Sequence, residues 1–448
     1  MSSKFNIFFF SLLVLTLSSL VLSEEPDKCV DKCKCFSVGE NRPEMDCTRQ
    51  NLSVIPGASE WPKNIFALDI SMNQLKRIDV MDSSDSLEFL DLASNAIETI
   101  EPNAFEKLTQ LRGLDLSHNE LMTLPTELFT DKLLTLNLSY NNIEILPNDL
   151  LKKCLFLQEL RLAHNPLRIL DSDLLRYSGQ LKALDLSAIS SFALKDDIFH
   201  QLFELTELDL SDNDFMLVPT IPLRSARNLK VLKLSKNPIR VLDEHSFVKM
   251  HTLTELYLDE MNELIEVKEK TFSYLFNLKK ISISNNPHLS YIDSYAFYGT
   301  FNRSWIALKE ANFRANRLST LPENTLPFCN LTTLDLRENP WTCDCHLLWA
   351  KYCHLRPELT HGIICANPAA LRGHDLIMVD HHNIHCEQNQ IYREVKMMRL
   401  FVIVFVSFTL FFIGLLFVLF IKRDLLMRWW TDRRRGTGAI YYVKAHSN

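Results

Sequence analysis

The sequence predicts an α/β solenoid with one short strand per turn, a parallel β-sheet on its concave side, a cysteine-rich cap at each end and one transmembrane helix. Three observations support this prediction. Leucines recur at a fixed period over residues 65–339, cysteines cluster on both sides of that region, and an uncharged apolar run follows it. Such a period is typical of solenoids, because no single unit can bury its own apolar side.

The repeat has twelve units, mostly 22 to 25 residues long, aligned on the first leucine or isoleucine of each. The third unit, LRGLDLSHNELMTLPTELF, has leucine at unit positions 1, 4, 6, 11 and 14, asparagine at 9 and phenylalanine at 19. In an extended segment, positions 4 and 6 point inward while 3 and 5 point outward. A strand is therefore expected at the same place in each unit, and the units begin at Ile65, Leu87, Leu111, Leu133, Leu157, Leu181, Leu205, Leu229, Leu253, Leu278, Leu308 and Leu331.

This pattern resembles the extracellular leucine-rich repeat family over about residues 50–342. The resemblance implies a horseshoe in which the position-9 asparagine bonds the backbone of adjacent coils and a phenylalanine stripe packs the convex side. Ile189 and Met261 replace the asparagine in two units. We expect a water or a locally shifted backbone at both, because an unpaired buried amide costs about 1–3 kcal/mol.

Cysteines mark a cap at residues 24–64 and another at residues 340–386. Spacing alone does not give their connectivity. The family resemblance implies four disulfides: Cys29 with Cys35, Cys33 with Cys47, Cys343 with Cys365, and Cys345 with Cys386. A bond between Cys329 and Cys353 stays open, and Cys154 is expected to be a buried free thiol.

The remaining segments predict a type I single-pass protein of the cell membrane with its amino terminus outside. Residues 1–23 are typical of a signal peptide, and 387–399 form a juxtamembrane stalk. Residues 400–421 carry no charge and would span about 33 Å as a helix, enough to cross a bilayer. The basic segment 422–448 is then a cytoplasmic tail, too short for the signalling domain of the Toll-type receptors that the outer region resembles.

Unit positions 3, 5 and 8 form the concave face, a common docking surface in this family. Asn137 heads a glycosylation sequon on the early part of this face, so a glycan there would direct ligands toward coils six to ten. The alternative is a solvated charge network that compensates itself. Further sequons begin at Asn51, Asn302 and Asn330. The predicted binding residues are Glu207, Asp209, Asp212, Lys233, Lys236, Glu255, Tyr257 and Glu260.

Motifs for enzyme chemistry are missing from the sequence, which has no G-x-S-x-G, no H-E-x-x-H and no glycine-rich phosphate loop. No catalytic residue or cofactor is therefore predicted. The segment DHHNIHC, with His381, His382 and His385, is more typical of a polar loop than of a metal site. The formal net charge of -7 is mild but unevenly spread, and the negative region 24–421 argues against nucleic acid as a partner for the bulk of the chain.

Two classes of function remain. The favoured one is a cell-surface recognition protein, adhesive or receptor-like, which binds an extracellular protein ligand or a neighbouring cell-surface protein through its concave face. The other is an accessory subunit that modulates another membrane protein, such as a channel or a larger receptor. A membrane co-receptor is a possible partner in both.

Overall fold

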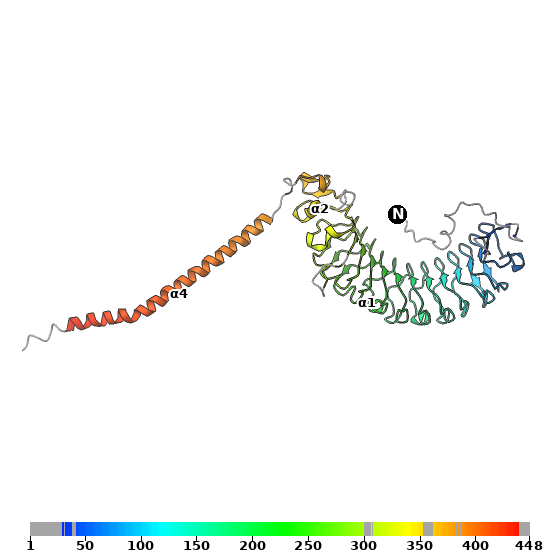
Figure 1. The fold of residues 1–448 in the computed structure, drawn as a ribbon, viewed down its shortest axis with the longest axis horizontal. Helices are drawn as coiled ribbons and strands as arrows, with labels where there is room; N and C mark the ends of the chain where they lie inside the picture. The colour runs from blue at the N-terminus through cyan, green and yellow to red at the C-terminus, as the bar shows by residue number, and fades with distance from the viewer. Residues whose placement is uncertain are drawn as a thin grey trace, which may run out of the picture. The chain divides into compact units, whose positions relative to one another are not determined.

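The computed structural model describes residues 29–30, 32–37, 42–299, 306, 308–352, 362–380, 384 and 388–438. The chain divides into two compact units, Met1–Asp380 and His381–Asn448. In the first unit the chain forms a curved solenoid whose coils follow one another in sequence order (Figure 1). The second unit contains α4, which runs from Gln388 to Gly438.

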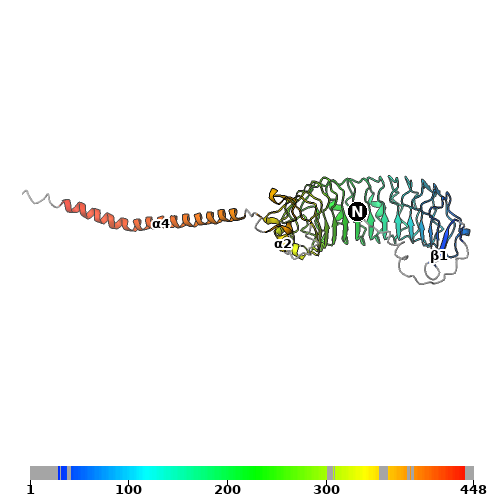
Figure 2. The same cartoon turned by 90° about the horizontal axis from the view of Figure 1, so that it is seen from above.

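The concave side of the solenoid carries a 14-stranded sheet, in the order β1-β2-β3-β5-β7-β8-β9-β10-β11-β12-β14-β16-β18-β19 (Figure 2). The first pair is antiparallel, and every later pair is parallel. From β3 onward each strand occupies unit positions 3 to 5, as the repeat predicts. The bounds are Lys34–Ser37, Pro43–Asp46, Ala67–Asp69, Phe89–Asp91, Gly113–Asp115, Thr135–Asn137, Glu159–Arg161, Ala183–Asp185, Glu207–Asp209, Val231–Lys233, Glu255–Tyr257, Lys280–Ser282, Glu310–Asn312 and Thr333–Asp335.

Three smaller sheets are present. Two of them form lateral ladders near unit positions 13 and 14: β4 (Arg77–Ile78) pairs with β6 (Thr99–Ile100), and β15 (Glu266–Val267) pairs with both β13 (Val241–Leu242) and β17 (Tyr291–Ile292). Coils three to seven, which are fully described, have no strand at these positions. The third sheet, β20 (Trp341–Thr342) with β21 (Cys365–Asn367), belongs to the carboxy-terminal cap.

Helices in the first unit are short. Among its described residues, the α-helices are α1 (Thr220–Leu223) and α2 (Trp349–Tyr352). The 3-10 helices η1 to η7 are Ala58–Glu60, Ser172–Leu175, Glu323–Thr325, Phe328–Asn330, Cys345–Leu347, Ala369–Leu371 and Leu376–Met378. Most of the back of each coil is therefore built from turns.

The apolar core runs through the inside of the coils. Leucines and isoleucines at positions 4 and 6, such as Leu208 and Leu210, are fully buried. The predicted phenylalanine stripe is also buried, and the Phe272 ring lies 4.5 Å from Phe297 and 5.7 Å from Phe247 between centroids. The stripe therefore packs the core, as predicted, and comprises Phe105, Phe129, Phe199, Phe247, Phe272 and Phe297.

The position-9 asparagines link neighbouring coils as the resemblance implied. Asn119 Nδ2 donates to the Leu92 carbonyl of the preceding coil and to the Leu116 carbonyl of its own, both at 3.0 Å. Its Oδ1 accepts from the Ile97 N–H at 3.1 Å. Each asparagine thus satisfies buried backbone groups of two coils at once.

Ile189 is the first exception. Arg168 (φ 49°) and Ser190 (φ 55°) adopt left-handed conformations next to it. The Arg168 N–H donates to the Ile189 carbonyl at 2.9 Å, and the Leu167 N–H donates to Asn165 O at 2.8 Å. The predicted backbone shift is therefore confirmed here.

Met261 differs from Ile189. Its N–H donates to Asn286 Oδ1 at 2.7 Å, and from Leu258 to Val267, all of which the structure describes, Glu260 alone is left-handed. Of the two alternatives predicted for this coil, the locally shifted backbone is therefore not observed at Met261.

Disulfides close both caps. Cys29–Cys35, Cys33–Cys47 and Cys343–Cys365 are bonded as the resemblance implied, and Cys154 is free and buried. Cys345 is also disulfide-bonded. Its expected partner Cys386 lies outside the described residues, and so does Cys353, the possible partner of Cys329.

Two tryptophans anchor the carboxy-terminal cap. Trp341 is fully buried and donates from Nε1 to the Leu336 carbonyl at 2.8 Å. The Trp349 ring stacks on Phe328 with centroids 3.7 Å apart. These rings cover the apolar interior that the last coil would otherwise expose.

The apolar segment Met397–Val418 lies within α4 and is long and apolar enough to cross a membrane, with a mean hydropathy of 2.9. The helix starts earlier than this segment, at Gln388, inside the expected stalk, and continues into the expected tail. The expected signal peptide, 1–23, lies outside the described residues.

Candidate protein-binding surface

Three neighbouring strands, β11, β12 and β14, carry most of the predicted binding residues. Their parallel register aligns Asp209 with Lys233 and Lys233 with Tyr257. Glu207 and Glu255 stand two residues earlier on the outer two strands, so their side chains point to the same face. The predicted residues are thus brought together on coils seven to nine.

Lys233 lies at the centre of this group. Its Nζ is 3.0 Å from Glu207 Oε1 and 3.4 Å from Asp209 Oδ2, and its side chain is 14% exposed. Two carboxylates on the adjacent strand therefore balance one poorly solvated cation. Solvent screens this interaction less than it screens a surface ion pair. Removing the lysine would therefore leave two partly buried carboxylates without a counter-charge, which destabilises the fold.

Tyr257 forms the second part of the surface. Its hydroxyl donates to Glu255 Oε2 at 2.7 Å, and Lys280 Nζ lies 5.3 Å from the centre of its ring. Burial and the Glu255 carboxylate raise the pKa of the Tyr257 hydroxyl. Tyr257 is half-buried, so part of its surface remains exposed.

Asp212, Lys236 and Glu260 occupy position 8, at the rim where the strands end. Lys236 Nζ lies 3.8 Å from Glu260 Oε2. All three line a shallow depression. The other residues around it are Asn262, Asn285, Pro287 and Ala315.

Two residues of this surface were not predicted. Lys280 stands at position 3 of the tenth coil, and reading position 3 together with position 5 would have found it. Asp259 accepts from the Ser282 hydroxyl and from both the N–H and the hydroxyl of Ser284, each at 2.7 Å. The sequence pattern did not indicate Asp259, because it stands at position 7, outside the positions 3, 5 and 8 that were assigned to the concave face.

The early coils carry a row of aspartates at position 5. Burial, with the neighbouring Asp115 and Asp69 carboxylates, raises the pKa of Asp91 to about 7. At the end of this row, Asn137 Nδ2 donates to Asp115 Oδ2 at 2.9 Å. The nitrogen that would carry the expected glycan therefore contacts the neighbouring strand.

Among the other sequons, Asn51 and Asn330 are exposed, whereas Asn302 lies outside the described residues. The histidines of the DHHNIHC segment, His381, His382 and His385, lie outside them as well. Within the described residues, no group of three or more histidine, cysteine or acidic side chains is arranged to hold a metal ion.

Comparison with known proteins agrees with this fold. Family models described as leucine rich repeat match residues 63–121, 132–154 and 203–264, all within the solenoid. With the parallel sheet and the asparagine contacts, these matches show that the solenoid is built from leucine-rich repeats.

Chondroadherin is similar over a short stretch. The rat and human proteins are each 37% identical over 93 residues, which is 20% of this chain and 23% of theirs. The match thus spans about a quarter of the length of these relatives.

Two solved structures share the fold. One is a chain of the glycosylated Toll–Spatzle complex of Drosophila, with 22% identity and a TM-score of 0.53 over 70% of this chain and 48% of that one. The other is a chain of the mouse RP105/MD-1 complex, with 23% identity and a TM-score of 0.56 over 75% of this chain and 53% of that one. At this identity the likeness concerns the fold.

Proposed function

We propose that this chain is a cell-surface recognition protein, adhesive or receptor-like, that binds a protein ligand through the concave face of coils seven to nine. The observation that carries the proposal is the alignment of Lys233 and Tyr257 on adjacent strands, each with a carboxylate in contact. A partly exposed tyrosine with a polar tip is typical of the anchor residues of protein interfaces.

The charge of this surface indicates the kind of ligand. Carboxylates outnumber ammonium groups around the tyrosine, since Glu207, Asp209, Glu255, Asp259 and Glu260 surround Lys233, Lys236 and Lys280. A ligand with basic side chains would therefore be attracted to it. Both similar structures are complexes of two proteins, Toll with Spatzle and RP105 with MD-1, which supports a protein partner here.

The alternative for these residues is a network that only balances its own charges. An ectodomain-bait proximity-labelling screen would identify the ligand, and binding of the captured protein would then be measured with Tyr257→Ala and Lys233→Glu. We expect each to weaken binding about tenfold or more. Tyr291→Ala is the control, because this tyrosine is exposed to solvent and lies on a lateral strand. Unchanged binding in both test variants would move the site off coils seven to nine.

The membrane topology is part of the proposal. Residues 1–23 would direct the chain to the secretory route, and Met397–Val418 would hold it in the cell membrane with the caps outside. Glycosidase treatment of surface-labelled protein tests this arrangement. We expect a loss of mass that decreases stepwise when Asn51, Asn137, Asn302 and Asn330 are each changed to glutamine.

One observation favours the accessory-subunit alternative. In α4, Trp429 and Trp430 are 54% and 57% exposed, and the Arg433 guanidinium lies 4.8 Å from the Trp429 ring centre. Such a helix could contact another membrane protein. Clustering of transfected cells would favour adhesion, whereas crosslinking within one membrane that recovers a multi-span protein would favour the accessory role.

A further inference from the structure

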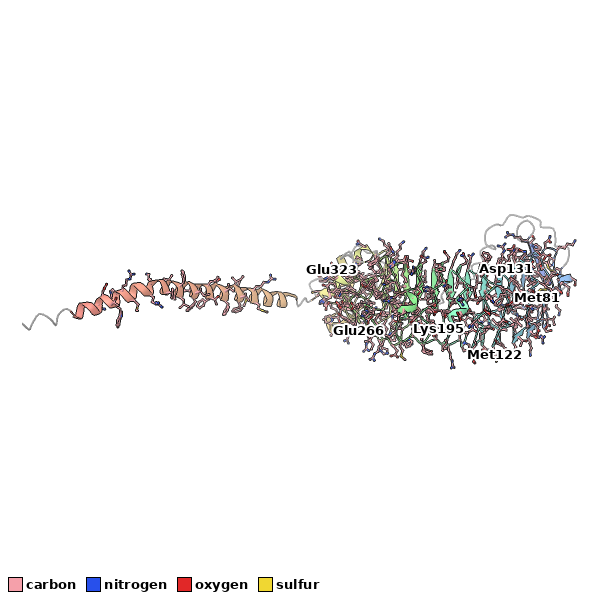
Figure 3. The ribbon with its side chains drawn as sticks, turned by 90° about the horizontal axis from the view of Figure 1, so that it is seen from below. Met81, Met122, Asp131, Lys195, Glu266 and Glu323 are labelled. Carbon is pink, nitrogen blue, oxygen red and sulfur yellow. A yellow bond between two sulfur atoms is a disulfide. The ribbon has the colours of Figure 1, made fainter. Side chains whose placement is uncertain are left out.

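A continuous row of exposed apolar side chains runs along one lateral side of coils three to seven. These side chains occupy unit position 12 or 13 and are between 62% and 75% exposed. Figure 3 labels Met122, the first of them. We call the row the lateral strip, and it consists of Met122, Ile145, Ile169, Phe192, Met216 and Leu217.

The strip coincides with the gap between the two lateral β-ladders. The β4–β6 pair ends in coil two, and the β13–β15–β17 sheet begins in coil eight. Where these ladders exist, the outward residues are mixed: Arg77, Thr99 and Glu266 are polar, whereas Val241 and Tyr291 are not. Among the described residues, strongly exposed apolar side chains follow one another from coil to coil only in the unladdered coils.

The exposed area suits a protein interface. Each side chain leaves roughly 100–150 Å² uncovered, so the strip offers on the order of 700 Å², of which the four side chains in coils three to six contribute about 500 Å², against the ~800 Å² per partner of a standard interface. Apolar patches of this size on a monomer usually mark a contact site. None of the four sequons falls between residues 138 and 301, so an N-linked glycan is not expected on coils five to seven.

Two opposite charges beside the strip indicate what covers it. Glu144 and Arg168 occupy position 12 in coils four and five, and both are exposed. Neither has an ion-pair partner in the part of the chain that the structure describes, although they stand in adjacent coils. Their apolar neighbours, Ile145 and Ile169, follow at position 13.

We infer that the lateral strip is the interface between two copies of this chain, related by a two-fold axis between coils four and five. That axis places coil four against coil five and coil three against coil six of the second copy. Glu144 then faces Arg168, Ile145 faces Ile169 and Met122 faces Phe192, and each contact occurs twice, as a two-fold interface requires. Coil seven, with Met216 and Leu217, faces coil two at the edge of this interface. This inference does not depend on the proposed ligand site.

The first test measures dimerisation of the full-length protein in detergent by analytical ultracentrifugation. Ile145→Glu combined with Ile169→Glu should raise the dimer dissociation constant at least tenfold. The matched control combines Leu155→Glu and Phe203→Glu, two residues that are 51% and 62% exposed at unit position 23 of coils four and six. A chain that is monomeric at every concentration, or a dimer that both pairs leave unchanged, would overturn the inference.

The second test separates a second copy from a different partner. Glu144→Arg alone places two arginines face to face, and Arg168→Glu alone places two glutamates face to face, so each should weaken the dimer. Both changes in one chain restore opposite charges and should restore the wild-type dissociation constant. Failure of this rescue, with all variants melting like the wild type, contradicts the two-fold pairing.

Discussion

Asn213 Oδ1 accepts a hydrogen bond from the Ile189 N–H at 3.2 Å, so the coil that has lost its own asparagine is held by the asparagine of the next. The same oxygen accepts from the Ser191 N–H at 3.0 Å, and Asn213 Nδ2 donates back to the Leu186 carbonyl at 2.9 Å. One buried side chain therefore satisfies several backbone groups of the coil that lacks its own asparagine.

Asn213→Ala should lower the free energy of unfolding by about 3 kcal/mol or more, because it leaves more than one buried backbone group unpaired. Urea titration followed by circular dichroism measures this change. Asn142→Ala, at an exposed asparagine, is the control and should change the value by less than about 0.5 kcal/mol. Equal effects would mean that the asparagine contacts contribute little.

Asp91 predicts a pH dependence of stability. Its pKa is about 7 when folded and near 3.9 in an unfolded chain, so the folded state keeps a proton that the unfolded state loses. Stability should therefore fall as pH rises from about 4 to about 7. The variant Asp91→Asn cannot ionise, so it removes this loss of stability. Its amide oxygen can still accept the hydrogen bond that the Ala93 N–H donates to Asp91 Oδ1 at 2.9 Å in the wild type.

We expect Asp91→Asn to melt a few degrees higher than the wild type at pH 8 and at nearly the same temperature at pH 4. Asp149→Asn, at an exposed aspartate, should change neither value. A gain that is equal at both pH values would contradict the link to ionisation.

Lys233→Gln should destabilise the fold by about 1–2 kcal/mol at pH 7.5, between the values for exposed and buried ion pairs. Burial and Asp209 raise the pKa of Asp185, and Lys233 lowers it. Removing the lysine raises the pKa of Asp185 further, so the carboxyl is more protonated at pH 5. The loss of stability in Lys233→Gln should therefore be smaller at pH 5 than at pH 7.5. Lys236→Gln, whose lysine is 49% exposed, is the comparison and should cost less. A deficit independent of pH would exclude this charge coupling.

Cys154 should be unreactive in the folded protein. Burial raises the pKa of its thiol to about 12, so almost no thiolate forms at pH 8. Alkylation by iodoacetamide, followed by mass spectrometry of the peptide that contains it, should be at least about 100-fold slower in buffer than in urea. Similar rates in both would show that this thiol is accessible.

The carboxy-terminal cap should depend on its disulfide. Cys343 and Cys365 are 22 residues apart and Cys29 and Cys35 only 6 apart, so chain entropy predicts losses of about 3 and about 2 kcal/mol when each pair becomes serine. Opening of the carboxy-terminal cap should also change the fluorescence of buried Trp341. An unaltered spectrum and stability would show that packing alone holds this cap.

Most of the fold could be predicted because one physical constraint repeats. Leu208 and Leu210 must both point inward, and this requirement fixes the strand, its register and the outward direction of Asp209 in a single step. The shift at Ile189 followed from the same reasoning. At Met261 the backbone is not shifted in this way, because the loss of one amide does not determine how the following residues rearrange.

The binding surface was less predictable. Glu207 and Lys233 were expected to be neighbours because register alone brings them together. The contacts of Asp259 with Ser282 and Ser284 depend on side-chain conformations that no period encodes. Exposure of the lateral strip likewise depends on where the small ladders begin and end, which the leucine spacing does not reveal.

The left-handed residue at position 8 has a consequence for how such a protein diversifies. All twelve coils adopt this conformation, yet none uses glycine and none uses a β-branched residue there. The occupants range from methionine and tyrosine to lysine and glutamate: Met72, Ser94, His118, Tyr140, His164, Ala188, Asp212, Lys236, Glu260, Asn285, Ala315 and Glu338. Substitutions at position 8 can therefore change the chemistry of this edge one residue at a time without changing the backbone conformation that sets the curvature of the solenoid.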